Sequence, residues 1–212
     1  MFSVLRFDEV NRLLPKKRGV PFDIYFGEMG LSAGKRRKRI DLAELLYDEL
    51  WAVFVLMFLM EQTGRIDYDE IATEVYDAYI RAGNAVDIPE GTLIERASEY
   101  AQNFVEATQS HEEDPYYFSE DRLVVNCENE SNGLYNTLDY DDAAEHGLTH
   151  KTWRTMEDEK VRETHAEIDG ITLPIDSLFE VGDSLMAYPK DTTYDASAEE
   201  IVGCRCWCEY TR

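Results

Sequence analysis

The chain has 212 residues, of which 44% are hydrophobic and 12% aromatic, proportions that are typical of a globular protein and exclude a disordered one. Its formal net charge is −23, but residues 1–40 hold ten bases and four acids, a net of +6, so the remaining residues carry −29. An acidic surface repels nucleic acid and anionic membranes. Any contact with either is therefore expected to run through the basic first forty residues.

The sequence favours neither secretion nor insertion into a membrane. The N-terminus lacks a basic and then apolar stretch that ends in a small-residue cleavage site. The longest apolar run is "WAVFVLMFLM", residues 51–60, and it is too short to cross a hydrocarbon core of about 30 Å. Three of the four cysteines crowd into "CRCWC" near the C-terminus, which suits a reduced intracellular compartment better than a disulfide framework. We expect no membrane partner.

Residues 1–40 are predicted to form a basic extended arm. They contain "LLPKKRGVP" and "GEMGLSAGKRRKR", in which proline, glycine and charge runs allow short helices at most. The arm is the candidate binding site for a partner or for DNA; the alternative is a solvated linker. The basic run, a name used below for its five consecutive cations, consists of Lys35, Arg36, Arg37, Lys38 and Arg39.

Helices are predicted to follow the arm. The first begins at Asp41 as N-cap and ends at Gly64, and the second begins at Asp67. The third starts after Pro89, and a fourth keeps helical spacing from Val124 up to Gly147. The domain boundaries expected from this pattern are a helical region at 41–118 and a C-terminal domain at 119–212.

Beyond Gly147 the segments are short and β-prone, and Asp, Gly and Pro separate them. They read "LTHKTWRT", "ITLPI", "SLMAYP" and "CRCWCEY". A short helix is predicted at 155–165, where Thr155 and Asp158 have capping-box spacing. The fold class is therefore α+β: a helical N-terminal half, then a small mixed α/β C-terminal domain with short antiparallel strands.

The C-terminal half resembles the phage Mu F-like head-morphogenesis family, the minor head or minor capsid proteins of tailed phages and prophages. The resemblance covers roughly residues 120–208, and the ordered set of residues carries it. The matching positions are Gly147, Lys151, Trp153, Asp158, Val161, Arg162, His165, Asp169, Gly170, Phe179, Pro189, Asp191, Cys204, Arg205 and Cys206.

The resemblance implies a non-enzymatic role in head morphogenesis, through protein–protein contacts at the portal or the capsid interior. The implied partners are the portal protein, the major capsid protein, or both, with packaged double-stranded DNA as a further partner of the basic run. The implied location is the virion, and the host cytoplasm during assembly. One alternative is a head-packaged small enzyme or toxin-like effector that uses His165, Arg162 and Asp158. Another is a zinc-binding regulator.

The resemblance also bears on zinc. Many relatives have cysteine at the positions of Arg162 and His165, and histidine at the position of Ile201. Of that four-ligand pattern, this chain keeps only His165 and Cys204. We therefore expect a metal-free variant with no cofactor, and zinc at His165, Cys204 and Cys206 is the disfavoured alternative.

The residues themselves suggest a structural role for this region. In an extended strand Cys204, Cys206, Cys208 and Tyr210 would share one face, and small thiols suit a buried strand inside a sheet. For His165 the choice lies between a structural network, a metal ligand and a base. Asp158 and Arg162 stand four residues apart and are expected to form an ion pair beside it. No complete catalytic constellation is present, so no catalytic residue is predicted.

Overall fold

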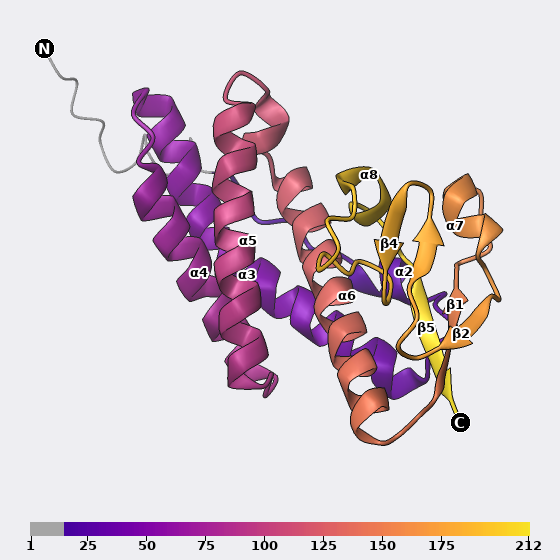
Figure 1. Ribbon diagram of the computed structural model, residues 1–212. Helices are drawn as coiled ribbons and strands as arrows, with labels where there is room; N and C mark the ends of the chain where they lie inside the picture. The colour runs from indigo at the N-terminus through magenta and orange to yellow at the C-terminus, as the bar shows by residue number, and fades with distance from the viewer. Residues whose placement is uncertain (1–14) are drawn as a thin grey trace, which may run out of the picture. The chain divides into compact units, whose positions relative to one another are not determined.

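The computed structural model describes residues 15–212 and divides the chain into two compact units (Figure 1). The first unit contains the described residues up to Val20 and Leu45–Val124, and the second contains Pro21–Glu44 and Val125–Arg212. Helices α3 (Ala33–Thr63) and α6 (Glu120–Glu145) each contribute residues to both units. The units are thus discontinuous in sequence and do not follow the predicted boundaries at 40 and 118. The α+β fold class is confirmed.

The first unit is helical. Helices α4 (Tyr68–Ala85) and α5 (Glu90–Ser110) pack against each other, and the short 3-10 helix η1 (Pro115–Phe118) follows. The predicted helix starts are confirmed: Asp67 is the N-cap of α4 and accepts a hydrogen bond from the backbone N–H of Glu70, and Pro89 immediately precedes α5. The buried residues recur at helical spacing: Ile71, Val75, Ala78 and Ala82 of α4 and Leu93, Ala97, Tyr100 and Ala101 of α5.

Helix α3 begins earlier than predicted. The hydroxyl of Ser32 accepts a hydrogen bond from the backbone N–H of Lys35, and its carbonyl accepts one from Arg36, so Ser32 caps a helix that starts at Ala33. Lysine and arginine are good helix formers. The basic run therefore lies in the first turns of α3 and not in an extended arm. The prediction of an extended arm is wrong for residues 33–40, as is the prediction of Asp41 as N-cap. Residues 1–14 of that arm lie outside the described part of the chain.

The second unit contains two small antiparallel sheets. Strand β1 (His150–Arg154) lies in the middle of one, between β2 (Thr172–Pro174) and β5 (Trp207–Thr211). Strands β3 (Phe179–Val181) and β4 (Ser184–Met186) form the other. The predicted closing strand is therefore an edge strand, and not an internal one. It is also shorter than expected, because Cys204–Cys206 precede it in irregular structure.

The core of this unit includes most of the signature's apolar positions. Trp153 is completely buried, and its ring lies 5.2 Å from that of Phe179. The cluster consists of Trp153, Ile168, Phe179, Val181, Met186, Cys204, Cys206 and Cys208. The burial expected for the thiols of Cys204, Cys206 and Cys208 is thus confirmed. Trp207 does not belong to this cluster. Its ring faces Gly30, where an added Cβ would lie 3.0 Å from the indole.

The helix predicted at 155–165 is wrong. Helix α7 covers only Glu163–Glu167, and α8 (Ala198–Ile201) is a second short helix. The side chains of Thr155 and Asp158 do accept backbone hydrogen bonds. The donors are the N–H groups of Glu157 and Lys160, each only two residues further on, and not three as in a capping box. Such local side-chain-to-backbone bonds stabilise turns and compete with helix formation.

A buried arginine organises the polar interior of the second unit. Arg39, in α3, is fully buried and donates to Asn132 Oδ1 (3.2 Å), Asn136 Oδ1 (3.0 Å) and Asp139 Oδ2 (3.0 Å). These three acceptors stand at i, i+4 and i+7 on α6, so they share one helix face. Burial lowers the pKa of Arg39, and the carboxylate of Asp139 opposes that effect.

The same asparagines hold the segment before β5. Asn132 Nδ2 donates to the carbonyls of Cys204 (3.2 Å) and Cys206 (3.3 Å). Asn136 Nδ2 donates to the carbonyls of Cys206 and Pro189, both at 3.1 Å. When a chain segment without strand partners is buried, its backbone carbonyls need hydrogen-bond donors from elsewhere in the protein. The two asparagines of α6 thereby supply the hydrogen-bond donors that a neighbouring strand would otherwise provide.

None of the helices within residues 15–212 has the length and apolar character needed to cross a membrane.

Replacement of Arg39 by methionine should destabilise the protein by about 3–5 kcal/mol, because it leaves Asp139 and two buried amide oxygens without their donor. The exposed neighbour Lys38, replaced by glutamine, is the matched control and should change stability by about 0.5 kcal/mol or less. Urea denaturation of both variants measures the difference. Equal stability of the two would contradict the organising role of Arg39.

Candidate functional site

The basic run is largely engaged within the chain. Lys35 pairs with Asp139 at 2.9 Å, and Arg36 donates to the carbonyl of Met29 at 3.1 Å. Arg37 pairs with Asp41 and lies 3.5 Å from Glu44. Arg39 is buried, and Lys38 is exposed. The structure therefore breaks up the predicted five-cation surface.

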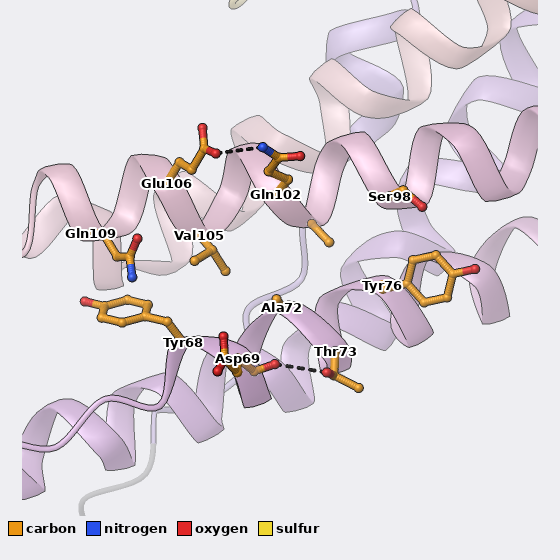
Figure 2. Close-up of a pocket in the computed structure, with 11 residues that line it drawn as sticks. Tyr68, Asp69, Ala72, Thr73, Tyr76, Ser98, Gln102, Val105, Glu106 and Gln109 are labelled. Carbon is orange, nitrogen blue, oxygen red and sulfur yellow. Dashed lines mark hydrogen bonds between the residues drawn. The ribbon is translucent and has the colours of Figure 1, made fainter.

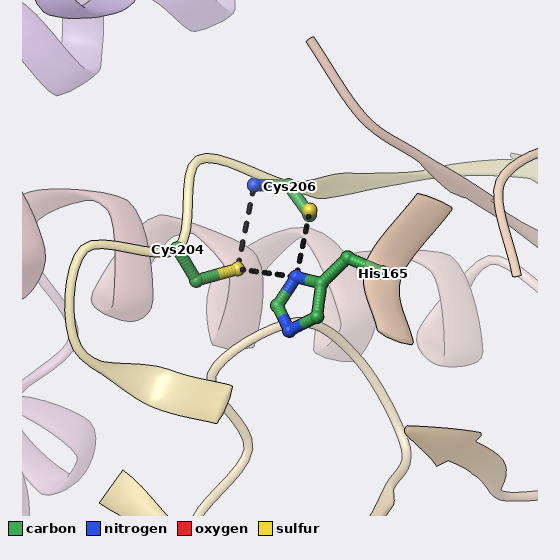
Figure 3. A group of neighbouring side chains, drawn as sticks. All are labelled: His165, Cys204 and Cys206. Carbon is green, nitrogen blue, oxygen red and sulfur yellow. Dashed lines mark hydrogen bonds between the residues drawn. The ribbon is translucent and has the colours of Figure 1, made fainter. Parts of the chain in front are cut away.

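The fold brings together three signature residues from distant parts of the sequence, His165 of α7 and Cys204 and Cys206 before β5 (Figure 3). All three are buried, with at most 3% of each side chain exposed. His165 Nδ1 lies 3.3 Å from Cys206 Sγ and 3.6 Å from Cys204 Sγ. The indole of Trp153 meets the imidazole edge-on, with ring centroids 5.6 Å apart.

Glu200 completes the cluster and was not among the predicted site residues. Its Oε2 lies 2.9 Å from His165 Nε2 and accepts a hydrogen bond from the hydroxyl of Thr164, also at 2.9 Å. The carboxylate is nearly buried. The family resemblance points to its neighbour Ile201, where many relatives have histidine. One glutamate in an acidic chain carries no signal by itself. Only the position of α8 reveals its role.

The side chains of the cluster shift one another's pKa values. Hydrogen bonds from Cys206 and from His165 hold the pKa of Cys204 well below its usual range, although burial opposes them. The hydrogen bond with Cys204 and burial raise the pKa of Cys206. Burial lowers the pKa of His165, but the hydrogen bond with Cys204 and the charges of Cys204 and Glu200 outweigh it, so that the net shift is upward. By contrast, burial raises the pKa of the neighbouring Cys208 to about 12.

The predicted ion pair of Asp158 has a different partner. Arg205 Nη2 donates to both oxygens of Asp158, at 2.6 and 2.7 Å, and this bond holds the pKa of Asp158 below its ordinary value. Arg162 instead donates to the carbonyl of Val202. The pairing of Asp158 with Arg162 is therefore wrong, because the helix that would have aligned them does not form.

A narrow crevice leads to the cluster. Its lining includes His165, Cys204 and Cys206 together with the cations Lys160, Arg162 and Arg205, and its volume is about 10 Å³. That volume accommodates one water-sized ligand. It cannot accommodate an organic substrate, which would need some hundreds of Å³.

Two further signature positions, Gly170 and Pro189, serve the backbone. Gly170 has a φ of +76°, in the left-handed region that favours glycine, and its N–H donates to the carbonyl of Trp153. Pro189 offers its carbonyl to Asn136. Neither position supplies a reactive group.

An open recess of about 550 Å³ lies on the first unit between α4 and α5 (Figure 2). Several of its polar side chains bond along their own helices, as Gln102 does to Glu106 and Thr73 to the carbonyl of Asp69, whereas the hydroxyl of Tyr68 donates to Glu112. The sticks in Figure 2 do not converge on a common point. No predicted site residue lies in this recess.

Comparison with known proteins gives one family. The family described as phage Mu protein F like protein matches residues 88–209, which is more than half of the chain and includes His165, Cys204, Cys206, Glu200 and strands β1 to β4. No curated protein and no solved structure gives a match.

A double-mutant cycle distinguishes the two pairings of Asp158. We expect Asp158→Asn and Arg205→Gln to couple by about 0.5–1 kcal/mol, because the bidentate bond is only partly exposed. The matched cycle of Asp158→Asn with Arg162→Gln should give a coupling near zero. Thermal or chemical unfolding of the single and double variants provides both values, and a larger coupling with Arg162 would contradict the observed arrangement.

Proposed function

Because the chain belongs to the family of phage Mu protein F-like proteins, we propose that it is a minor head protein that acts in head morphogenesis at the portal or the capsid interior. The observation that carries this proposal is the extent of the family match. It covers residues 88–209 and so includes α5, α6, strands β1 to β4 and the start of β5. The shared feature is a whole structural framework and not one motif.

The role we propose is one of protein–protein contact. The crevice at His165 is too small for a substrate, and the recess between α4 and α5 lacks converging groups. The effector alternative required His165, Arg162 and Asp158 to act together. Their side chains bond to Glu200, Val202 and Arg205 respectively, so each is engaged elsewhere. These contacts support a structural role over catalysis.

The proposed partner is a head protein, the portal or the major capsid protein, and not packaged DNA. Tight binding to a phosphate backbone requires several free cations on one surface. Ion pairs and backbone contacts engage Lys35, Arg36 and Arg37, and Arg39 is buried. The formal charge of −23 adds repulsion from DNA.

Mass spectrometry of purified heads and of assembly intermediates tests the proposed location. We expect peptides of this chain in both, in low copy relative to the major capsid protein. Capture with a tagged full-length chain should recover the portal or the major capsid protein. A chain missing from heads and intermediates alike would overturn the proposal.

Double-stranded DNA provides the test of the partner class. We expect no binding of the full chain to a duplex at physiological salt, and no change when Lys35, Arg36, Arg37 and Lys38 are replaced by glutamine. Arg39 is left intact in that variant because it is buried. Wild-type binding that falls with salt at a log–log slope of about −5, and that the variant loses, would identify a DNA contact instead.

A further inference from the structure

Three soft ligand atoms converge at the buried cluster with spacings that fit one metal ion. His165 Nδ1, Cys204 Sγ and Cys206 Sγ all lie within 4.8 Å of one another. In a tetrahedral zinc site, bond lengths of about 2.05 Å to nitrogen and about 2.3 Å to sulfur place the two ligand atoms about 3.6 Å apart. The observed separations of 3.3 and 3.6 Å already match that edge.

We propose that His165, Cys204 and Cys206 bind a zinc ion through these three atoms. Mixed nitrogen and sulfur ligands in a tetrahedral arrangement suit zinc, whereas ions such as magnesium and calcium prefer oxygen. Binding releases the thiol protons, so that two thiolates neutralise the charge of the ion. The proposal concerns this chain's own residues and does not depend on the proposed role in the head.

Glu200 has the place of an outer-shell partner. A histidine that binds zinc through one nitrogen usually donates its other ring N–H to a carboxylate, which fixes the tautomer and the ring orientation. Glu200 Oε2 lies 2.9 Å from His165 Nε2, whereas the two sulfurs are near the other ring nitrogen, Nδ1. Thr164 fixes the same carboxylate oxygen. The imidazole is thereby oriented with Nδ1 toward the thiols.

The second unit also fixes the two cysteines. Asn132 and Asn136 bind the carbonyls of Cys204 and Cys206, and the backbone N–H of Cys206 lies 3.5 Å from Cys204 Sγ. Supported on both sides, the segment presents its sulfurs to His165 without help from a strand ladder. The crevice of about 10 Å³ at these residues has room for one ion.

The proposed ligands differ from the four positions that the family resemblance implies. Arg162 donates to the carbonyl of Val202, and Ile201 has no ligand atom, so that set cannot hold zinc here. The sequence-based expectation of a metal-free variant followed from those two losses. The fold adds Cys206, whose sulfur is nearer to His165 than that of Cys204.

A nucleophilic reading of the same residues is less favoured. Cys204, His165 and Glu200 follow one another as a thiol, a base and an orienting carboxylate would. An acyl-transfer site, however, needs space for a substrate beside the thiol, and Cys204 is 2% exposed at the end of a crevice sized for a single water. A metal ion needs no more space than this.

The first test uses the wild-type full-length chain. Purified without added chelator, it should contain one zinc ion per chain by elemental mass spectrometry. Replacement by Co²⁺ should give the visible d–d bands of a tetrahedral site and a thiolate-to-metal charge-transfer band. Removal of zinc should lower the melting temperature, because the ion connects α7 to the segment before β5. A wild-type chain without zinc that also gives no cobalt bands would overturn the proposal.

Matched variants then assign the ligands. Cys206→Ser should lose zinc and weaken the charge-transfer band, whereas Cys208→Ala, which removes an equally buried thiol that is not among the three proposed ligands, should keep both. Glu200→Gln should bind zinc about 10–100-fold more weakly, because the amide is a poorer acceptor for the imidazole N–H. Circular dichroism establishes that each variant is folded. Zinc retained by folded Cys206→Ser, or lost from folded Cys208→Ala, would contradict the ligand set.

Discussion

The second unit depends on the burial of one guanidinium group. Arg39 is taken out of water at a cost of several kcal/mol, and three side chains of α6 supply its acceptors. Two of them, Asn132 and Asn136, use their amide N–H groups to hold the carbonyls of Cys204 and Cys206. A single charge on α3 therefore fixes, through α6, a segment that is some 165 residues further along the chain.

This arrangement explains how a segment without regular secondary structure can hold two cysteine side chains in fixed positions. Cys204 and Cys206 lie outside the sheets, yet both are buried and their carbonyls are satisfied. Their sulfurs point to His165 Nδ1 (Figure 3). Glu200 bonds to the other ring nitrogen, Nε2, and so orients the ring. The structure thus joins residues of α3, α6, α7 and α8 to the segment before β5 in one polar network. That network is compatible with the structural role of a phage head protein and with a bound ion.

Local patterns gave the correct result wherever a local interaction dominates. Asp67 and Pro89 mark the starts of α4 and α5, and the apolar spacing of both helices matches their packed faces. The short strands after Gly147 are also where the β-prone segments indicated, apart from β3. The prediction of an extended arm is wrong for residues 33–40. It rested on the prolines and glycines before Ser32, whereas the basic run after Ser32 forms a helix. The Asp158–Arg162 pair failed because it assumed a helix that local caps prevent.

The sequence alone determined the fold class, most helix boundaries and the family, because caps, apolar periodicity and an ordered signature are properties of neighbouring residues. Which partner each charged or reactive side chain has was decided by the tertiary structure. Arg39 lies in a basic run, Glu200 lies in no motif and Cys206 stands at an alternating position, but the partners of all three lie 35 or more residues away. Burial and long-range contacts decide the chemistry of such groups, and neither can be read from spacing along the chain.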